Sequence, residues 1–99
     1  MIVMKFGGTS VESAEAIERV AKIVGSRRKQ SPVVVVSAMA KVTDQLVAMG
    51  HKAASGACEA SLEMLTALRE RHLQTAIELV GAKRGASLAP RLEAFLRYC

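Results

Sequence analysis

Two short apolar segments on either side of one amphipathic segment restrict the fold of this sequence most. IVMKF at 2–6 and PVVVVS at 32–37 are rich in β-branched residues and almost continuously apolar. That composition is typical of strands covered on both faces, as in a parallel sheet. Pro32 stands at the start of the second segment, where its missing N–H does least harm.

The segment between these predicted strands has the spacing of a helix. Ser10 or Ser13 can cap its N-terminus, and Gly25 can close its C-terminus. Strand, helix and strand in succession predict a βαβ unit, whose crossover is nearly always right-handed. The apolar residues that recur at intervals of three and four, and so predict one buried stripe, are Ala14, Ile17, Val20, Ala21 and Val24.

The remainder of the sequence predicts helices. One begins at TDQLVAMGHKAA, where Thr43 or Asp44 can act as the cap, and a longer one runs from about residue 57 to Gly81. GAKRGAS, at 81–87, is predicted to be a loop. Pro90 then suits the first turn of a last helix, which directs inward Leu92, Phe95 and Leu96.

Two strands are too few for a stable sheet. A parallel pair leaves both outer edges unpaired, and sheets usually need three or more strands. The sequence also ends at FLRYC, within a helical pattern. We therefore expect residues 1–99 to be the first piece of a larger α/β domain, whose sheet is completed by further chain or by a partner.

Composition excludes several classes of protein. The sequence has 99 residues, 51% of them hydrophobic and 23% charged, which fits one small globular domain rather than a disordered chain. No apolar stretch is long enough to cross a bilayer, and the start lacks the pattern of a secretory signal. Cys58 and Cys99 form no disulfide framework, which favours a reduced, cytoplasmic location.

The net charge of +5 suits an anionic small molecule better than a nucleic acid. The basic residues are spread along the chain, and only 3% of residues are aromatic, so no platform for stacking bases is expected. His51 and His72 are far apart and have no companions at metal-ligand spacing. We expect both to be surface or helix-face histidines, and we expect no metal site built by side chains.

KFGGTS, at 5–10, lies where the first strand passes into the first helix, and ligands bind at this end of strands in open α/β sheets. Glycine amides can approach an anion closely, and a helix N-terminus adds free N–H groups. Neither a Walker A loop nor a dinucleotide fingerprint is present. On spacing alone, a phosphate site and an ordinary tight turn stay equally open; the candidates are Lys5, Gly7, Gly8, Thr9 and Ser10.

SAMAKVTDQL, at 37–46, also follows a strand and precedes a helix. It should lie beside the first loop, where Ser37 and Thr43 could bind a carboxylate or a phosphoryl group. Thr43 could instead only cap the helix, and Asp44 could be a general base or a cap. Two such loops on adjacent strands make a shared site more plausible than either loop alone.

These two segments resemble a known family. VMKFGGTSV, at 3–11, is similar to the amino-terminal signature of aspartate kinases, and VVVSAMAKVTDQL, at 34–46, is similar to their second conserved loop. The resemblance covers about the first half of the chain. It implies a three-layer αβα sandwich of the amino acid kinase type, of which residues 1–99 supply the first βαβ unit and the helices that follow.

The resemblance also implies an activity and roles for residues. The parent would transfer the γ-phosphoryl group of ATP, with Mg²⁺, to the β-carboxylate of L-aspartate, and would form a homo-oligomer. Lys5 would be catalytic and would bind the phosphates with Gly7, Gly8, Thr9 and Ser10. The residues that would face aspartate are Ser37, Ala38 and Thr43.

Two alternatives remain at this stage. The parent could be an amino acid kinase that acts on another carboxylate or a carbamate, or the chain could be a non-catalytic module that binds an anion. Lys41 departs from many aspartate kinases, which carry a smaller residue there, often glycine. That change could alter the shape of the second loop or add a contact to an anion.

Overall fold

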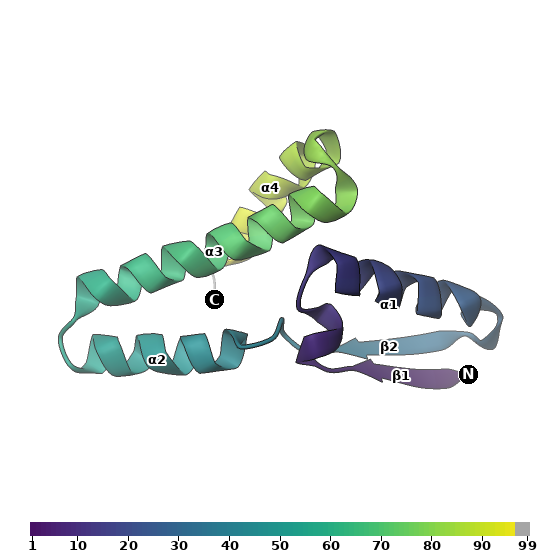
Figure 1. The fold of residues 1–99 in the computed structure, drawn as a ribbon, viewed down its shortest axis with the longest axis horizontal. Coiled ribbons are helices and arrows are strands. Elements are labelled where there is room, and N and C mark those ends of the chain that lie inside the picture. Colours follow the sequence, from purple (N-terminus) through teal and green to yellow (C-terminus); the bar gives the residue numbers. More distant parts are fainter. Residues whose placement is uncertain (97–99) are drawn as a thin grey trace. The chain divides into compact units, whose positions relative to one another are not determined.

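The computed structural model describes residues 1–96, apart from the side chains of residues 82–86, 95 and 96. The chain forms two compact units, of which the first is Met1–Lys41 and the second begins at Val42 (Figure 1). The first unit contains the two predicted strands and the helix between them. The second unit consists of helices.

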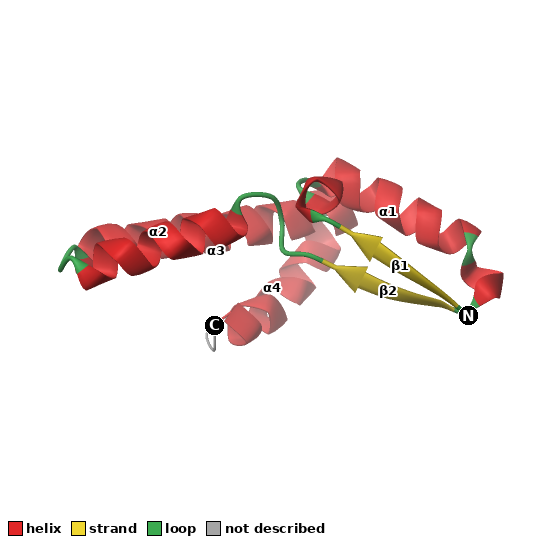
Figure 2. Ribbon diagram, turned by 90° about the horizontal axis from the view of Figure 1, so that it is seen from below, coloured by secondary structure: helices red, strands yellow, loops and turns green. Residues whose placement is uncertain are grey.

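The first unit is the predicted βαβ arrangement. Its two strands are parallel, as Figure 2 shows. They pair in register from Ile2 opposite Pro32 to Phe6 opposite Val36. Both strand predictions are confirmed, the second to within one residue. The elements, in chain order, are β1 (Ile2–Phe6), the 3₁₀ helix η1 (Gly8–Val11), α1 (Ala14–Ser26), the 3₁₀ helix η2 (Arg28–Gln30) and β2 (Pro32–Val36).

Helix α1 begins at one of its two predicted caps. The Ser13 hydroxyl accepts a hydrogen bond of 3.1 Å from the backbone N–H of Ala16, while Ser10 lies within η1. The prediction that Gly25 closes the helix was wrong. Gly25 is helical, and the backbone N–H of Arg27 instead donates to the carbonyls of Gly25 and Val24. Chain reversal comes later, where Ser31 adopts a left-handed conformation with φ 50°.

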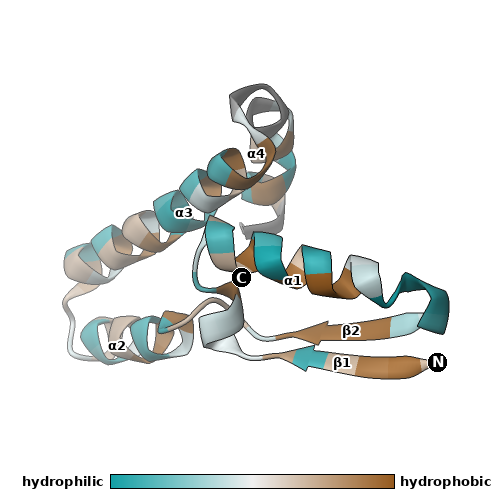
Figure 3. Ribbon diagram, turned by 45° about the vertical axis from the view of Figure 1, so that its right-hand side comes forward, coloured by the Kyte–Doolittle hydropathy of each residue, from teal (hydrophilic) through white to brown (hydrophobic). Residues whose placement is uncertain are grey.

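The core of the first unit lies between α1 and the sheet. Val11, Ala16 and Val20 are its buried residues, so Ala16 belongs to the stripe although the spacing did not select it, and the exposed Ala21 does not. The expectation that both strands are covered on two faces is not met by the described residues. Val3 is 67% exposed, and Val33–Val36 are 40–57% exposed, along strands that are mostly hydrophobic (Figure 3).

The second unit is a set of three helices, α2 (Val42–Ala54), α3 (Cys58–Val80) and α4 (Ala82–Leu96), in which α3 packs against both of the others. The prediction of Thr43 or Asp44 as a cap was wrong, since α2 begins at Val42 and both residues lie in its first turn. No helix in the described part of the chain is long and apolar enough to cross a membrane.

The predicted loop at 81–87 was also wrong. α3 ends, as expected, at Gly81, whose φ of 86° reverses the chain, but α4 begins at the next residue and includes Pro90 in its interior. One left-handed glycine is enough to separate the helices, and alanine, lysine and arginine are strong helix formers that continue the second one. Of the residues predicted to point inward, Leu92 is half-buried. The side chains of Phe95 and Leu96 are not among those the structure describes, and Cys99 lies outside the described residues.

Candidate anion-binding site

Both predicted loops leave the sheet at the same edge. The last pair of the parallel register joins Phe6 to Val36. The backbone N–H of Ser37 donates a hydrogen bond of 3.0 Å to the carbonyl oxygen of Phe6, which carries the pairing one residue further. The turn that starts at Gly7 and the loop that starts at Ser37 are therefore neighbours at the carboxyl ends of β1 and β2.

Gly8 brings these loops into contact. A Cβ at this position would lie 3.3 Å from the Cα of Ala40 and 3.4 Å from the carbonyl oxygen of Ala38. Both neighbours are backbone atoms, which cannot rotate away as the end of a side chain can. Glycine at position 8 thus allows the first loop to pack directly on the second.

Gly7 has different surroundings. Its φ of −79° and ψ of 179° are open to any residue, and a Cβ there would meet no heavy atom within 4 Å. Nothing among the described residues demands a glycine at this position. Because glycine has no side chain and no other atom fills the space beside it, a ligand could approach the backbone of Gly7 closely.

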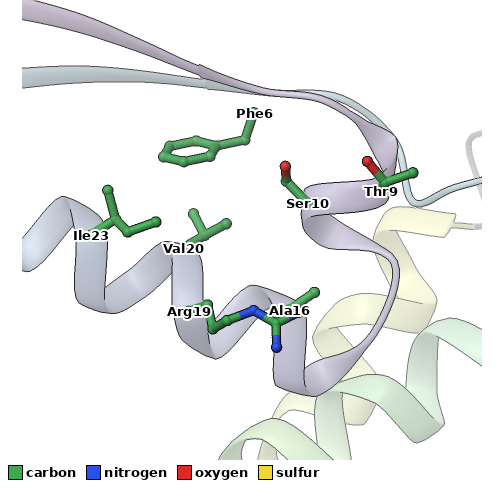
Figure 4. A pocket seen from close by; sticks show the side chains of 7 residues that line it. All are labelled: Phe6, Thr9, Ser10, Ala16, Arg19, Val20 and Ile23. Carbon is green, nitrogen blue, oxygen red and sulfur yellow. The ribbon is translucent and has the colours of Figure 1, made fainter.

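Lys5 is on the face of β1 away from α1. Successive side chains of a strand point to opposite faces, and along β1 Met4 and Phe6 are half-buried while Lys5 is exposed. Figure 4 shows Phe6 directed toward Val20 on α1. Lys5 makes no hydrogen bond or ion pair with any residue the structure describes. Its ammonium is free to meet an anion at the end of the strand.

Thr9 and Ser10 lie on the α1 side of the turn. Together with Phe6, Ala16, Arg19, Val20 and Ile23 they line a cavity of about 280 Å³ between η1 and α1 (Figure 4). The backbone N–H of Ser10 is already donated to the Gly7 carbonyl at 3.1 Å. A role of Ser10 toward a phosphate would therefore fall to its hydroxyl, and this role stays a prediction, as does that of Thr9.

The residues assigned to the acceptor fall in both units. Ser37 and Ala38 follow β2 and are exposed, and the carbonyl of Ala38 is one of the atoms that face Gly8. Thr43 is exposed in the first turn of α2. Its hydroxyl makes no hydrogen bond with the described residues, so capping does not account for it. Its part in the site stays a prediction.

Sequence reasoning missed one residue of the second loop, Ala40, which makes the close approach to Gly8. It singled out Lys41 but not its backbone, which adopts a left-handed conformation with φ 68°. A small residue two positions after another small one was the available signal for Ala40. No pattern in a single sequence indicates a left-handed lysine.

The other residues considered from the sequence, His51, His72 and Cys58, lie on helices α2 and α3. His72 is half-buried on α3, with its Nδ1 2.7 Å from the Leu68 carbonyl oxygen, and His51 is exposed on α2. Cys58 is a free thiol at the first position of α3. Among the described residues no group of three or more His, Cys, Asp or Glu side chains could hold a metal ion.

Comparison with known proteins shows the family of this chain. The model of the amino acid kinase family matches residues 1–96. Aspartokinase 2, chloroplastic, of Arabidopsis thaliana is 48% identical over 79 residues, which are 78% of this chain and 14% of that protein.

Similarity extends to two further kinds of protein. A bifunctional aspartokinase/homoserine dehydrogenase of the same plant is 39% identical over 91% of this chain and 10% of its own length. Aspartokinase 2 of Bacillus subtilis is 41% identical over 72% of the chain and 18% of its own length. The chain thus spans less than a fifth of each of these relatives.

Proposed function

Because this chain belongs to the amino acid kinase family, we propose that it is the amino-terminal part of an aspartate kinase. The whole protein would transfer the γ-phosphoryl group of ATP to the β-carboxylate of L-aspartate, the first step toward lysine, threonine and methionine. The close contact between Gly8 and Ala40 carries the proposal, because it joins the two loops at one sheet edge. The similarity to proteins named aspartokinase supports the choice of acceptor.

The first loop would bind the phosphates. Lys5, exposed and unpaired among the described residues, would stabilise charge on the transferring group. The backbone at Gly7 faces open space, and its amide and that of Gly8 would hold phosphate oxygens. Thr9 and Ser10, which lie on the α1 side of the turn, would contribute their hydroxyls.

The second loop would orient the acceptor. Ser37 offers an exposed hydroxyl immediately after β2, and Ala38 follows it in the segment that contacts Gly8. Thr43 would add a second hydroxyl from the first turn of α2. Hydroxyl and amide donors suit a carboxylate, which accepts hydrogen bonds through both oxygens.

In phosphoryl transfer the protein mainly positions the reactants and stabilises charge, and it need not form a covalent bond to the substrate. An oxygen of the ionised acceptor carboxylate attacks the γ-phosphorus, and the bond from that phosphorus to the β,γ-bridging oxygen breaks. The electron pair of this bond leaves with ADP. The products are an acyl phosphate and ADP, and no proton has to leave the acceptor. Lys5 and the glycine amides would stabilise the oxygens that gain charge.

Mg²⁺ belongs to the proposal as the partner of the nucleotide. The described residues offer it no cluster of acidic ligands, so they do not fit a resident magnesium site and no step is assigned to a metal held by this chain. The sheet would be completed by chain outside residues 1–99 into a three-layer αβα sandwich. We propose a homo-oligomeric and cytoplasmic enzyme, for which the free thiol of Cys58 suits a reduced compartment.

The test is a panel of acceptors with the full-length protein. L-aspartate, L-glutamate, N-acetyl-L-glutamate and carbamate would each be supplied with Mg-ATP, and ADP release would be measured. Turnover with L-aspartate well above the others supports the proposal. Turnover with another acceptor would assign a different amino acid kinase, and nucleotide binding without turnover on any acceptor would favour a non-catalytic module.

A further inference from the structure

Lys41 has a backbone conformation that is costly for a residue with a Cβ. Its φ is 68°, in the left-handed region, which side chains other than glycine rarely adopt. Ser31 is the other left-handed residue that is not glycine within residues 1–96, and a turn accounts for it, because its N–H donates to the Arg28 carbonyl at 3.2 Å. Strained residues of this kind gather at functional sites, where surrounding structure holds them.

The position of Lys41 is fixed by the contact between the two loops. It directly follows Ala40, whose Cα and N would lie 3.3 and 3.5 Å from a Cβ at Gly8. Lys41 is therefore the sequence neighbour of the residue that packs on the turn containing Gly7 and Gly8. Both loops leave the same edge of the sheet, where Lys5 ends the exposed face of β1.

The ammonium of Lys41 has no partner in the described part of the chain. The side chain is exposed and forms no hydrogen bond or ion pair with a described residue. A lysine carries its ammonium on a flexible four-carbon stem, which can reach past the residues beside it. Lys5 on β1 and Lys41 on the second loop are thus two exposed cations, unpaired among the described residues, at one edge of the sheet.

We propose that Lys41 is a second cationic contact for the phosphates of the bound nucleotide. Its ammonium would bind non-bridging oxygens of the terminal phosphates, opposite the contribution of Lys5. The left-handed backbone would be tolerated because it keeps this charge beside the glycine turn. This inference rests on the proposed function only in that the site binds ATP.

Three substitutions in the full-length protein separate charge from backbone. Lys41→Met removes the charge and keeps the length and the Cβ, Lys41→Arg keeps the charge, and Lys41→Gly removes the charge together with the conformational cost. The KM for ATP and for L-aspartate would be measured, with the Kd for a non-hydrolysable ATP analogue and the melting temperature of each variant.

If the ammonium of Lys41 binds the phosphates, the three variants should differ in their affinity for the nucleotide. Lys41→Met should raise both the KM for ATP and the Kd for the analogue by about tenfold, the size of one charge-assisted hydrogen bond. The KM for L-aspartate should change less than twofold. Lys41→Arg should stay within about threefold of the wild type, and Lys41→Gly should lose affinity as Lys41→Met does while melting at a higher temperature.

Three results would overturn the proposal. Lys41→Met could leave both nucleotide constants unchanged, it could raise only the KM for L-aspartate, or Lys41→Gly could restore the affinity that Lys41→Met loses. Analogue binding also separates the two proposals. A wild-type protein that binds the analogue but phosphorylates another acceptor contradicts the aspartate assignment alone, whereas one that binds no analogue contradicts both.

Discussion

Gly8 and Ala40 lie on loops that follow different strands, yet a methyl group added to Gly8 would stand 3.3 Å from the Cα of Ala40. The parallel pairing of β1 with β2 brings both loops to one edge, and the hydrogen bond from Ser37 to Phe6 extends that pairing into the second loop. The edge is therefore a single surface built by two segments that are far apart in sequence.

Gly8→Ala should push the two loops apart. The added methyl group would meet backbone atoms of Ala38 and Ala40, which have to shift by a few tenths of an ångström, and overpacking of this kind costs about 1–3 kcal/mol. We expect a lower melting temperature of the full-length protein and a strong loss of kcat. An unchanged melting temperature with full turnover would contradict the contact.

Gly7→Ala is the matched control and should behave differently. A Cβ at Gly7 meets no atom of the described chain, and the backbone conformation accepts alanine, so stability should not fall. If phosphate oxygens approach this turn, the methyl group should raise the KM for ATP severalfold. An unchanged KM for ATP would leave Gly7 with no role in binding.

Ser13→Ala should loosen the start of α1 without affecting catalysis. The Ser13 hydroxyl accepts from the backbone N–H of Ala16, and the loss of such a cap costs about 1 kcal/mol. Hydrogen–deuterium exchange in the full-length protein should speed up in peptides from the first turn of α1. Ser10→Ala, which removes no cap of α1, should leave that exchange unchanged.

Thr43→Ala tests the acceptor side. Thr43 is exposed in the first turn of α2, and its hydroxyl caps nothing in the described structure. The variant should therefore melt like the wild type but show a raised KM for L-aspartate, with the KM for ATP within about twofold. A lower melting temperature with an unchanged KM for L-aspartate would show that Thr43 stabilises the fold and does not bind the acceptor.

Local periodicity predicted the strands and most helices because each depends on neighbouring residues. β-branched runs gave β1 and β2, and Gly81 ended α3 as expected. The segment after Gly81 was mistaken for a loop because its glycines and polar residues are typical of one. A single left-handed glycine proved enough to separate two helices, and the chain then stayed helical through Pro90.

The candidate site was predictable only in part. The chemistry of Lys5 and of the glycine turn follows from residue types at the end of a strand. The packing of Gly8 on Ala40 depends on where the second loop passes, which a single sequence does not encode locally. Strand composition does not say which other segments cover a strand, so it predicted more cover for Val33 and its neighbours than the described residues provide.

Turnover of L-aspartate by a Lys5→Met variant of the full-length protein tests directly whether Lys5 stabilises the transferring phosphoryl group. Lys5 is exposed at the end of β1 and unpaired among the described residues, so its removal should not disturb the fold. We expect kcat to fall by about a hundredfold or more, because charge stabilisation in the transition state is lost. A folded Lys5→Met variant with near wild-type turnover would contradict it.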